Sequence, residues 1–282
     1  MNLRIFLSSV FTSISVLGIA QESVHKKFDL FIYTGYNRSA FTRSDFHISG
    51  EGYDLVFRDV AAQDAPTPFS FQGYFTPGRF SIPQYTYRFG LYLNKRWSIS
   101  VGLDHMKYYM ITNQNLNIEG EVSPAASEKY AGVYGGSPVE VPWRFLWFHH
   151  SDGLNYGSVE LEYNYPVWVS KKSNFSWELI GNGGLGLYVP KTFVQVFDEP
   201  VDNKFHLAGY GLSAKVGTRF NFFKHFYLEA SSKNGFAILP SILVNNEKSA
   251  QAKQRFGWTQ FFGAVGFNIP LNAKQESDAQ KP

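Results

Sequence analysis

The sequence predicts an all-β protein, an antiparallel transmembrane β-barrel with eight strands in its wall. Three observations lead to this fold class. Aromatic residues make up 18% of the 282 residues, and such side chains suit the pleated surface of a sheet. Segments of about ten residues alternate between apolar and polar side chains, as tilted strands that cross a bilayer do. The links between these segments are alternately short and long, which is typical of outer-membrane barrels.

The first element is an export signal over residues 1–20. Arg4 precedes an apolar stretch over residues 5–19, and the small residues Gly18 and Ala20 lie three and one positions before the expected cleavage site. A short membrane anchor is the alternative. Serines and threonines dilute the apolar run, however, and no stop-transfer charges follow it. We therefore expect export to the outer membrane of a Gram-negative bacterium.

Composition excludes several classes of site and partner. The chain has no cysteine, which excludes a disulfide scaffold, a thiolate metal site and a cysteine nucleophile. The formal charge of +3 is small and no basic stripe is present, so nucleic acid is not an expected partner. No motif indicates a cofactor.

Period-two alternation defines the strands of the mature chain. In the segment 208–220, for example, Leu212 and Val216 oppose Lys215 and Arg219. The expected strands, in order, are residues 27–36, 82–93, 97–108, 158–167, 175–187, 206–222, 226–234 and 255–269. A water-soluble sandwich would alternate in the same way. The lengths of the links between the strands therefore distinguish a membrane barrel from a sandwich.

The links alternate strictly in length. Links 94–96, 168–174 and 223–225 are short and basic, whereas links 37–81, 109–157, 188–205 and 235–254 are long. Short turns at the periplasmic end and long extracellular loops follow from this pattern. Aromatic residues crowd the short-turn end, where an interfacial girdle is expected: Tyr92, Trp97, Trp168, Phe175, Trp177, Phe222, Phe226 and Phe267. The barrel then spans residues 21–271, and residues 272–282 form a disordered periplasmic tail.

Charged side chains on the polar faces of these strands point into the barrel. An eight-stranded barrel is just wide enough for side chains to fill, so these charges should pair with one another and no open channel is expected. The predicted network consists of Asp29, Arg88, Asp104, Glu160, Glu162, Glu178, Lys215, Arg219 and Glu229.

The whole pattern resembles the small OmpA-like outer-membrane barrels. Segments "GYD" (52–54), "DHMKY" (104–108) and "SDGLNY" (151–156) also resemble those of exported barrels of uncharacterised function. These resemblances imply the fold and the outer membrane, with membrane lipid as a partner, and they leave the function and the oligomeric state open.

The stretch "FHHSDGLNY" (148–156) carries a second, local resemblance. Upstream of it, residues 141, 143, 145, 147, 149 and 151 share a face that is apolar enough to touch lipid. The H-x-S pattern is similar to that of lipid A deacylases and outer-membrane phospholipases. That resemblance implies that His149 is a general base and Ser151 a nucleophile, with Glu162 or Asn164 orienting the histidine.

Two departures weaken this resemblance. Asp152 stands where those families have asparagine, and Glu162 falls on the lumen face whereas His149 and Ser151 face lipid. The alternative is a simple turn at "SDG" with rim histidines. A metal site of His105, His149 and Asp152 lacks any spaced ligand motif, so no metal is expected.

The long loops suggest a third role. Residues 44–59 predict a β-hairpin across "GEG", and the segments 115–122 and 139–148 predict a second hairpin. Together with the aromatic run 69–80 they serve as a surface for an extracellular ligand, or pack on each other. If 115–122 and 141–148 cross the membrane instead, the barrel has ten strands. The sequence thus favours a structural or ligand-binding barrel, and the alternative is an outer-leaflet lipid esterase.

Overall fold

The computed structural model describes residues 23–68, 84–247 and 249–271. The predicted signal peptide, the aromatic run 69–80 and the C-terminal tail lie outside these residues. Within them the structure consists of fifteen strands in one antiparallel sheet. The all-β prediction is confirmed.

Eight of these strands close into a barrel. Their order around the wall is β1-β5-β6-β9-β10-β13-β14-β15, and β15 pairs with β1 to complete the ring. Their bounds are Leu30–Phe41, Tyr85–Tyr92, Trp97–Met110, Leu146–Val169, Phe175–Tyr188, Gly209–Phe222, Phe226–Leu243 and Gln251–Ile269. The barrel wall therefore has the predicted eight strands. The ten-stranded alternative is wrong, because residues 115–122 pair with β3 outside the wall.

The barrel is apolar outside and polar inside, the reverse of a soluble protein. On β13, Leu212 and Val216 are exposed by 57% and 65%, whereas Ser213 and Lys215 are buried. The same alternation runs along every wall strand, because successive side chains point to opposite faces. A continuous belt of exposed apolar side chains is stable only against hydrocarbon. The fold is a transmembrane β-barrel.

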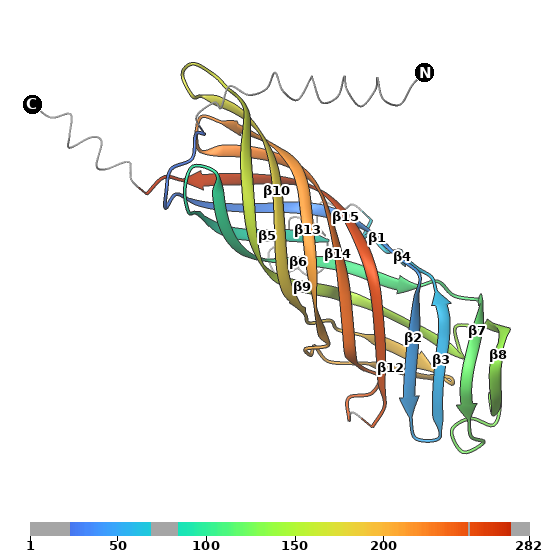
Figure 1. Cartoon of the computed structure of the whole chain (residues 1–282). Helices are drawn as coiled ribbons and strands as arrows, with labels where there is room; N and C mark the ends of the chain where they lie inside the picture. Colours follow the sequence, from blue (N-terminus) through green and yellow to red (C-terminus); the bar gives the residue numbers. More distant parts are fainter. Residues whose placement is uncertain (1–22, 69–83, 248, 272–282) are drawn as a thin grey trace, which may run out of the picture.

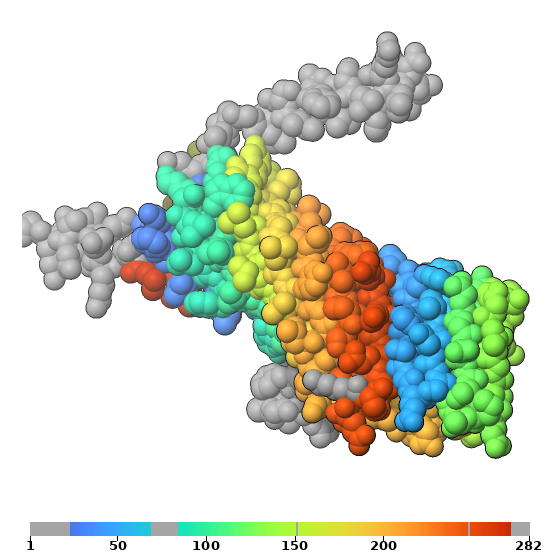
Figure 2. Space-filling view, turned by 60° about the horizontal axis from the view of Figure 1, so that its bottom comes forward, coloured from blue at the N-terminus to red at the C-terminus, as the bar shows by residue number. Residues whose placement is uncertain are grey.

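Beyond the belt, the long-loop end carries a second structured unit, the extension. It contains a hairpin of β2 (Ser44–Gly50) with β3 (Tyr53–Val60), and one of β7 (Gln114–Val122) with β8 (Gly132–Val141). β15 pairs with β2, and β3 pairs with β7, so both hairpins continue the barrel sheet. Figures 1 and 2 show these strands side by side at the end of the barrel away from the termini.

The opposite side of the extension is built on β9. Its first residues pair with the short hairpin of β11 (Phe193–Val196) and β12 (Glu199–Asp202), and β4 (Ala62–Asp64) pairs with the end of β6. The rings of Phe46 and Phe148 stack with centroids 4.0 Å apart, between the two sides. A continuous apolar core fills the space around them. The predicted hairpins therefore pack into one unit at the long-loop end of the barrel.

Three local expectations are wrong. Val141 and Phe145 do not face lipid but are buried in this core, because Pro142 and Phe145 form a turn that ends the alternation. The link expected at 235–254 is shorter, since β14 and β15 run past the membrane to leave only residues 244–250 between them. Tyr92 does not join the aromatic girdle, because its side chain points inward and is fully buried.

Candidate functional site

The barrel interior holds two four-membered groups of paired charges. In the group nearer the extension, Arg88 lies 3.0 Å from Asp104 and 2.8 Å from Glu160. Lys233 contacts the same two carboxylates. Hydrogen bonds from Thr86 to Asp104 and from Asn182 to Glu160 occupy the remaining oxygens. Two acids and two bases from four strands thus neutralise each other.

The second group lies nearer the short-turn end. Lys215 and Arg219 each bridge both Glu162 and Glu229, at distances of 2.7 to 2.9 Å. Arg219 also donates to Asn164 and to the hydroxyl of Tyr92. Full pairing offsets the large cost of burying these ions.

A third pair closes the short-turn end. His25, which precedes the first strand, lies 2.9 Å from Glu178 and stacks on Tyr92. All nine residues of the predicted network are buried. Eight of them belong to these groups, whereas Asp29 precedes the first strand and accepts from the backbone of Lys26 instead. Sequence reasoning missed Lys233, although its position four residues after Glu229 on one strand was a usable signal. It also missed His25, because this residue precedes the first strand and the alternation of apolar and polar residues does not extend to it.

The stretch "FHHSDGLNY" is not a turn but part of the 24-residue strand β9. The predicted "SDG" turn is wrong. Residues 151–153 form a bulge opposite β6, where the register shifts between Met106 and Tyr108. Gly153 has a φ of +108°, and a Cβ there would lie 2.4 Å from His105 and from Asn155. Glycine at this position therefore lets the bulge close over the hydrogen bond between those two side chains.

His149 is enclosed by aromatic rings on the outer face of the extension. Its imidazole stacks on Tyr109 at 4.5 Å and on Phe193 at 4.9 Å, and the ring of Trp147 lies at 4.7 Å. This burial lowers the pKa of His149 to about 4, although Asp152 and Asp202 act in the opposite direction. The imidazole is neutral at pH 7 and a weak base.

The predicted catalytic residues do not come together. Glu162 lies thirteen positions from His149 on the same strand, which places it roughly 40 Å away. Its carboxylate is held by Lys215 and Arg219 inside the barrel, and Asn164 is bound to Arg219 there. Ser151 lies in the bulge, two residues after His149. The proposed orienting role of Glu162 or Asn164 is therefore wrong.

The bulge forms one end of a cavity, the boundary groove, of about 430 Å³. The groove lies on the outer surface where the apolar belt meets the extension. Its lining residues are Tyr87, Leu103, His105, Asp152, Asn155, Val189 and Phe205. The belt supplies apolar walls, and the bulge supplies polar groups. Beside it, Lys191 lies 2.8 Å from Asp152 and 2.9 Å from Asp202.

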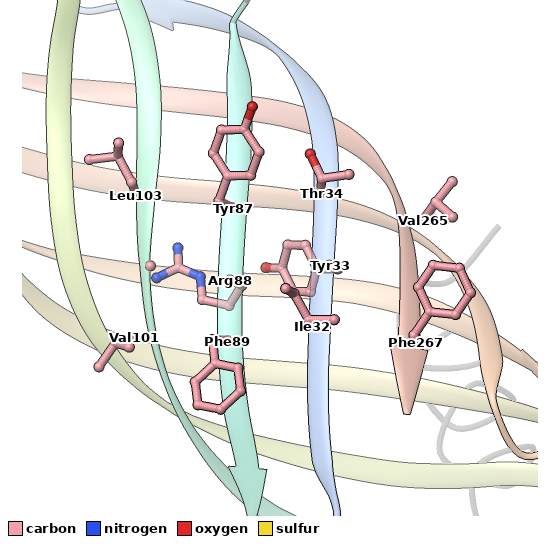
Figure 3. A pocket seen from close by; sticks show the side chains of 11 residues that line it. Ile32, Tyr33, Thr34, Tyr87, Arg88, Phe89, Val101, Leu103, Val265 and Phe267 are labelled. Atoms are coloured by element: carbon pink, nitrogen blue, oxygen red, sulfur yellow. The ribbon is translucent and has the colours of Figure 1, made fainter. Parts of the chain in front are cut away.

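A larger depression of about 570 Å³ lies within the belt itself. Figure 3 shows the side chains that line it, from strands β1, β5, β6 and β15. Ile32, Phe89 and Val101 are exposed apolar side chains, whereas Tyr33 and Arg88 belong to the buried interior. Its lining is mainly apolar, and the polar side chains Thr34 and Tyr87 also border it.

Within the described ranges, no three His, Asp or Glu side chains are placed to hold a metal ion. Across those same residues, no helix has the length and apolarity that a membrane span requires.

No family model and no curated protein matches the chain. Among solved structures, the chain is similar to the attachment invasion locus protein Ail of Yersinia pestis, with 11% identity and a TM-score of 0.34 over 86% of this chain and 99% of that one. It is also similar to the outer membrane protein AlkL, with 10% identity and a TM-score of 0.40 over 90% of this chain and 96% of that one. A third similar structure is OprG from Pseudomonas aeruginosa, with 12% identity and a TM-score of 0.39 over 88% of this chain and 99% of that one. Likenesses of this size identify no family.

Proposed function

We propose that this chain is exported to the outer membrane and binds an amphipathic ligand in the boundary groove at the extracellular surface. The sealed barrel serves as the anchor, and the extension supports one end of the site. The observation that carries the proposal is the two-sided chemistry of the groove. Leu103 and Phe205 offer apolar contact, and Asp152 and Asn155 offer polar contact, within one cavity.

The apolar part of the groove suits an acyl or alkyl chain. Leu103, Val189 and Phe205 are all exposed apolar side chains, and Leu103 belongs to the wall strand β6. A ligand that buries a chain against them gains about 25 cal/mol for each Å² of apolar surface. Because the belt contacts hydrocarbon, such a ligand reaches the groove from the outer leaflet.

The polar end selects the headgroup by its hydrogen-bond donors. Asp152 and Asp202 flank the ammonium group of Lys191, so two carboxylates lie beside the groove. Hydroxyl or ammonium groups of a ligand can donate to these carboxylates, whereas a sulfate head offers only acceptors. We therefore propose a ligand whose head carries hydroxyl groups or an amine.

The site is held in place by packed strands and by a local hydrogen-bond pair. Asn155 Oδ1 accepts a hydrogen bond from Nδ1 of His105 at 2.8 Å, and the amide nitrogen of Asn155 donates to the carbonyl of Val189. These bonds join β6, β9 and the segment after β10. Such preorganisation lowers the entropic cost of binding.

Ester hydrolysis is not the function that this geometry favours. His149 lies in a closed aromatic stack, and its ring nitrogen Nδ1 has no hydrogen-bond partner among the described residues. A catalytic base needs an orienting group in that position.

Cysteine protection tests the proposal, because the natural chain contains no cysteine. A Phe205→Cys variant in phosphatidylcholine nanodiscs would be modified with N-ethylmaleimide in the presence of three decyl amphiphiles. These carry a glucoside, an ammonium or a sulfate head. We expect decyl glucoside and decylammonium to slow the modification at least about threefold more than decyl sulfate does.

A matched control comes from the same belt. Phe261 is exposed to a similar degree on β15 but lies outside the groove, so a Phe261→Cys variant should respond equally to the three amphiphiles. Adding Asp152→Asn to Phe205→Cys should reduce the preference. Equal protection by all three amphiphiles at both positions would refute the proposal.

A further inference from the structure

The depression of about 570 Å³ in the apolar belt, the belt depression, is bordered by two rows of side chains. Each row follows the strand register, because its members are direct partners on neighbouring strands. The row nearer the extension consists of Leu103, Tyr87, Thr34 and Val265, and the second row consists of Val101, Phe89, Ile32 and Phe267. Figure 3 shows both rows across β6, β5, β1 and β15. The belt depression therefore crosses four adjacent strands of the wall.

The belt depression and the boundary groove share part of their lining. Tyr87 and Leu103 border both cavities, and they are direct partners across β5 and β6. From this shared pair, the boundary groove extends along β6 to His105, whereas the belt depression extends in the other direction to Val101. The two cavities therefore lie end to end, with the pair of Tyr87 and Leu103 at their junction.

The second row of the belt depression is entirely apolar. All four of its side chains are exposed on the lipid-facing surface. They lie two residues beyond the junction, which corresponds to about 7 Å along the strands. Water does not reach the hydrocarbon region of a bilayer, and a hollow that no atom fills forfeits dispersion contacts. In the membrane, hydrocarbon therefore fills the belt depression.

The row at the junction contains one polar contact. The side chains of Thr34 and Tyr87 are hydrogen-bonded to each other, and the two residues are partners across β1 and β5. This bond satisfies hydroxyl groups that would be costly to leave without a partner in hydrocarbon. An alkyl chain can therefore pass the junction without breaking a hydrogen bond of the wall to water.

Hydrophobicity alone does not select the chain that occupies the belt depression. The tails of the surrounding lipids are as apolar as the side chains of the belt. A ligand whose head is bound in the boundary groove, however, holds its own chain at the junction, and this attachment raises the local concentration of that chain. Attachment therefore favours the chain of the bound ligand over the tails of free lipids.

We infer that the ligand of the boundary groove is a long-chain amphiphile, whose alkyl chain passes the junction and lies in the belt depression. This inference rests on the proposed function and names the class of ligand that the groove takes. The chain points from the extension towards the middle of the belt, as the tail of a lipid does in the same leaflet. A chain that passes the junction gains packing contacts with the second row, whereas a shorter chain contacts the boundary groove alone.

Photolabelling with two forms of decyl glucoside tests the inference. One form carries a diazirine next to the head, and the other carries it at the end of the chain. The full chain would be irradiated with each probe in phosphatidylcholine nanodiscs, and mass spectrometry would identify the labelled residues. We expect the head-side probe to label Phe205 in the boundary groove. Unlabelled decyl glucoside should compete with both probes.

The chain-end probe should label the second row selectively. The reference residues are Leu179 on β10 and Val216 on β13, which are exposed to lipid on the opposite side of the wall. We expect labelling of Phe89 and Val101 to exceed that of the reference residues at least about threefold, because attachment concentrates the chain at the junction.

A matched pair of variants tests the role of the belt depression. Thr34→Trp fills the space between the two rows, so the chain-end probe should lose its preference for Phe89 while the head-side probe still labels Phe205. Val216→Trp makes a change of similar size on the opposite side of the wall and should leave both patterns unchanged. Heat-modifiable gel mobility verifies that each variant is folded.

The two probes distinguish failure of this inference from failure of the proposed function. Equal chain-end labelling on the two sides of the wall, with competed head-side labelling of Phe205, would overturn the inference and leave the boundary groove as the binding site. A preference for Phe89 that persists in Thr34→Trp would also overturn it. Head-side labelling of Phe205 that unlabelled decyl glucoside does not reduce would contradict the proposed function and the inference together.

Discussion

Arg219 and Glu229 are direct partners across β13 and β14, and their side chains meet inside the barrel with Nη2 2.8 Å from Oε2. The same guanidinium nitrogen contacts Glu162, on a strand of the wall that is not adjacent to β14. One cross-strand pair therefore joins distant parts of the wall. Because the pairing is complete, the interior tolerates ions that would be very costly alone.

Removing one member of this group should destabilise the barrel. An Arg219→Met variant leaves Glu162 and Glu229 with Lys215 as their shared cation, at an expected cost of about 3–5 kcal/mol. Urea titration of the protein in lipid bilayers measures the change. The double variant Arg219→Met/Glu229→Gln restores the charge balance and should recover part of the loss. A double variant that is less stable than Arg219→Met alone would contradict the paired-charge account.

The extension core should unfold separately from the wall. Phe46 is fully buried and stacks on Phe148, so Phe46→Ala should cost the extension about 3–5 kcal/mol. We expect trypsin to cleave the extension of this variant faster while the heat-modifiable mobility of the barrel is unchanged. The exposed Phe236→Ala, on the lipid-facing surface of β14, is the control and should leave the rate of cleavage unaltered.

The bulge in β9 should require glycine at position 153. Gly153→Ala places a methyl group against His105 and Asn155 at a φ that alanine rarely adopts. The expected strain is about 1–3 kcal/mol, and the protection of Phe205→Cys by decyl glucoside should weaken. Gly157→Ala on the same strand meets no atom within 4 Å and should retain that protection. Equal protection in the two variants would show that the bulge is not part of the binding site.

His149 should make the extension less stable in acid. Its pKa is about 4 in the folded chain and about 6.5 when unfolded, so the unfolded chain binds more protons between these values. The contribution of His149 is complete above pH 6.5 and is lost as the pH falls towards 4. At pH 4.5 the loss is on the order of 2 kcal/mol.

Hydrogen exchange of the extension at pH 7 and pH 4.5 measures this loss. His149→Phe keeps an aromatic ring in the stack and removes the titration, so the pH dependence should shrink. His150, whose buried side chain has a pKa lowered to about 3, keeps a residual dependence in both proteins. An unchanged pH dependence in His149→Phe would show that other groups cause it.

The alternation of apolar and polar residues predicted the wall well, because each lipid-facing strand repeats one simple physical rule. Leu212 and Val216 outside, with Lys215 and Arg219 inside, follow directly from period two. The same rule places the side chain of Tyr92 inside the barrel. The predicted aromatic girdle included Tyr92 because that prediction considered residue type and not strand alternation. Lys233 was missed for the same reason, although its parity matches that of Glu229.

The extension was less predictable because its contacts are non-local. The hairpin across Gly50 and Gly52 has a local signal in the sequence, and it forms. Its pairing with residues 251–254 of β15 depends on a register between segments about two hundred residues apart, which no local pattern encodes. The bulge at Gly153 interrupts the alternation of β9. The sequence therefore suggested a turn where the strand continues, and the boundary groove was not foreseen.

The most direct test of the whole account is spin-label accessibility along β13. Single cysteines at Leu212, Ser213 and Val216 would carry nitroxide labels in a lipid bilayer. We predict that labels at Leu212 and Val216 collide with oxygen dissolved in the hydrocarbon, and that the label at Ser213 is shielded from both oxygen and a water-soluble nickel chelate. Collision of the nickel chelate with labels at Leu212 and Val216, or free access of it to Ser213, would contradict a sealed barrel in the membrane.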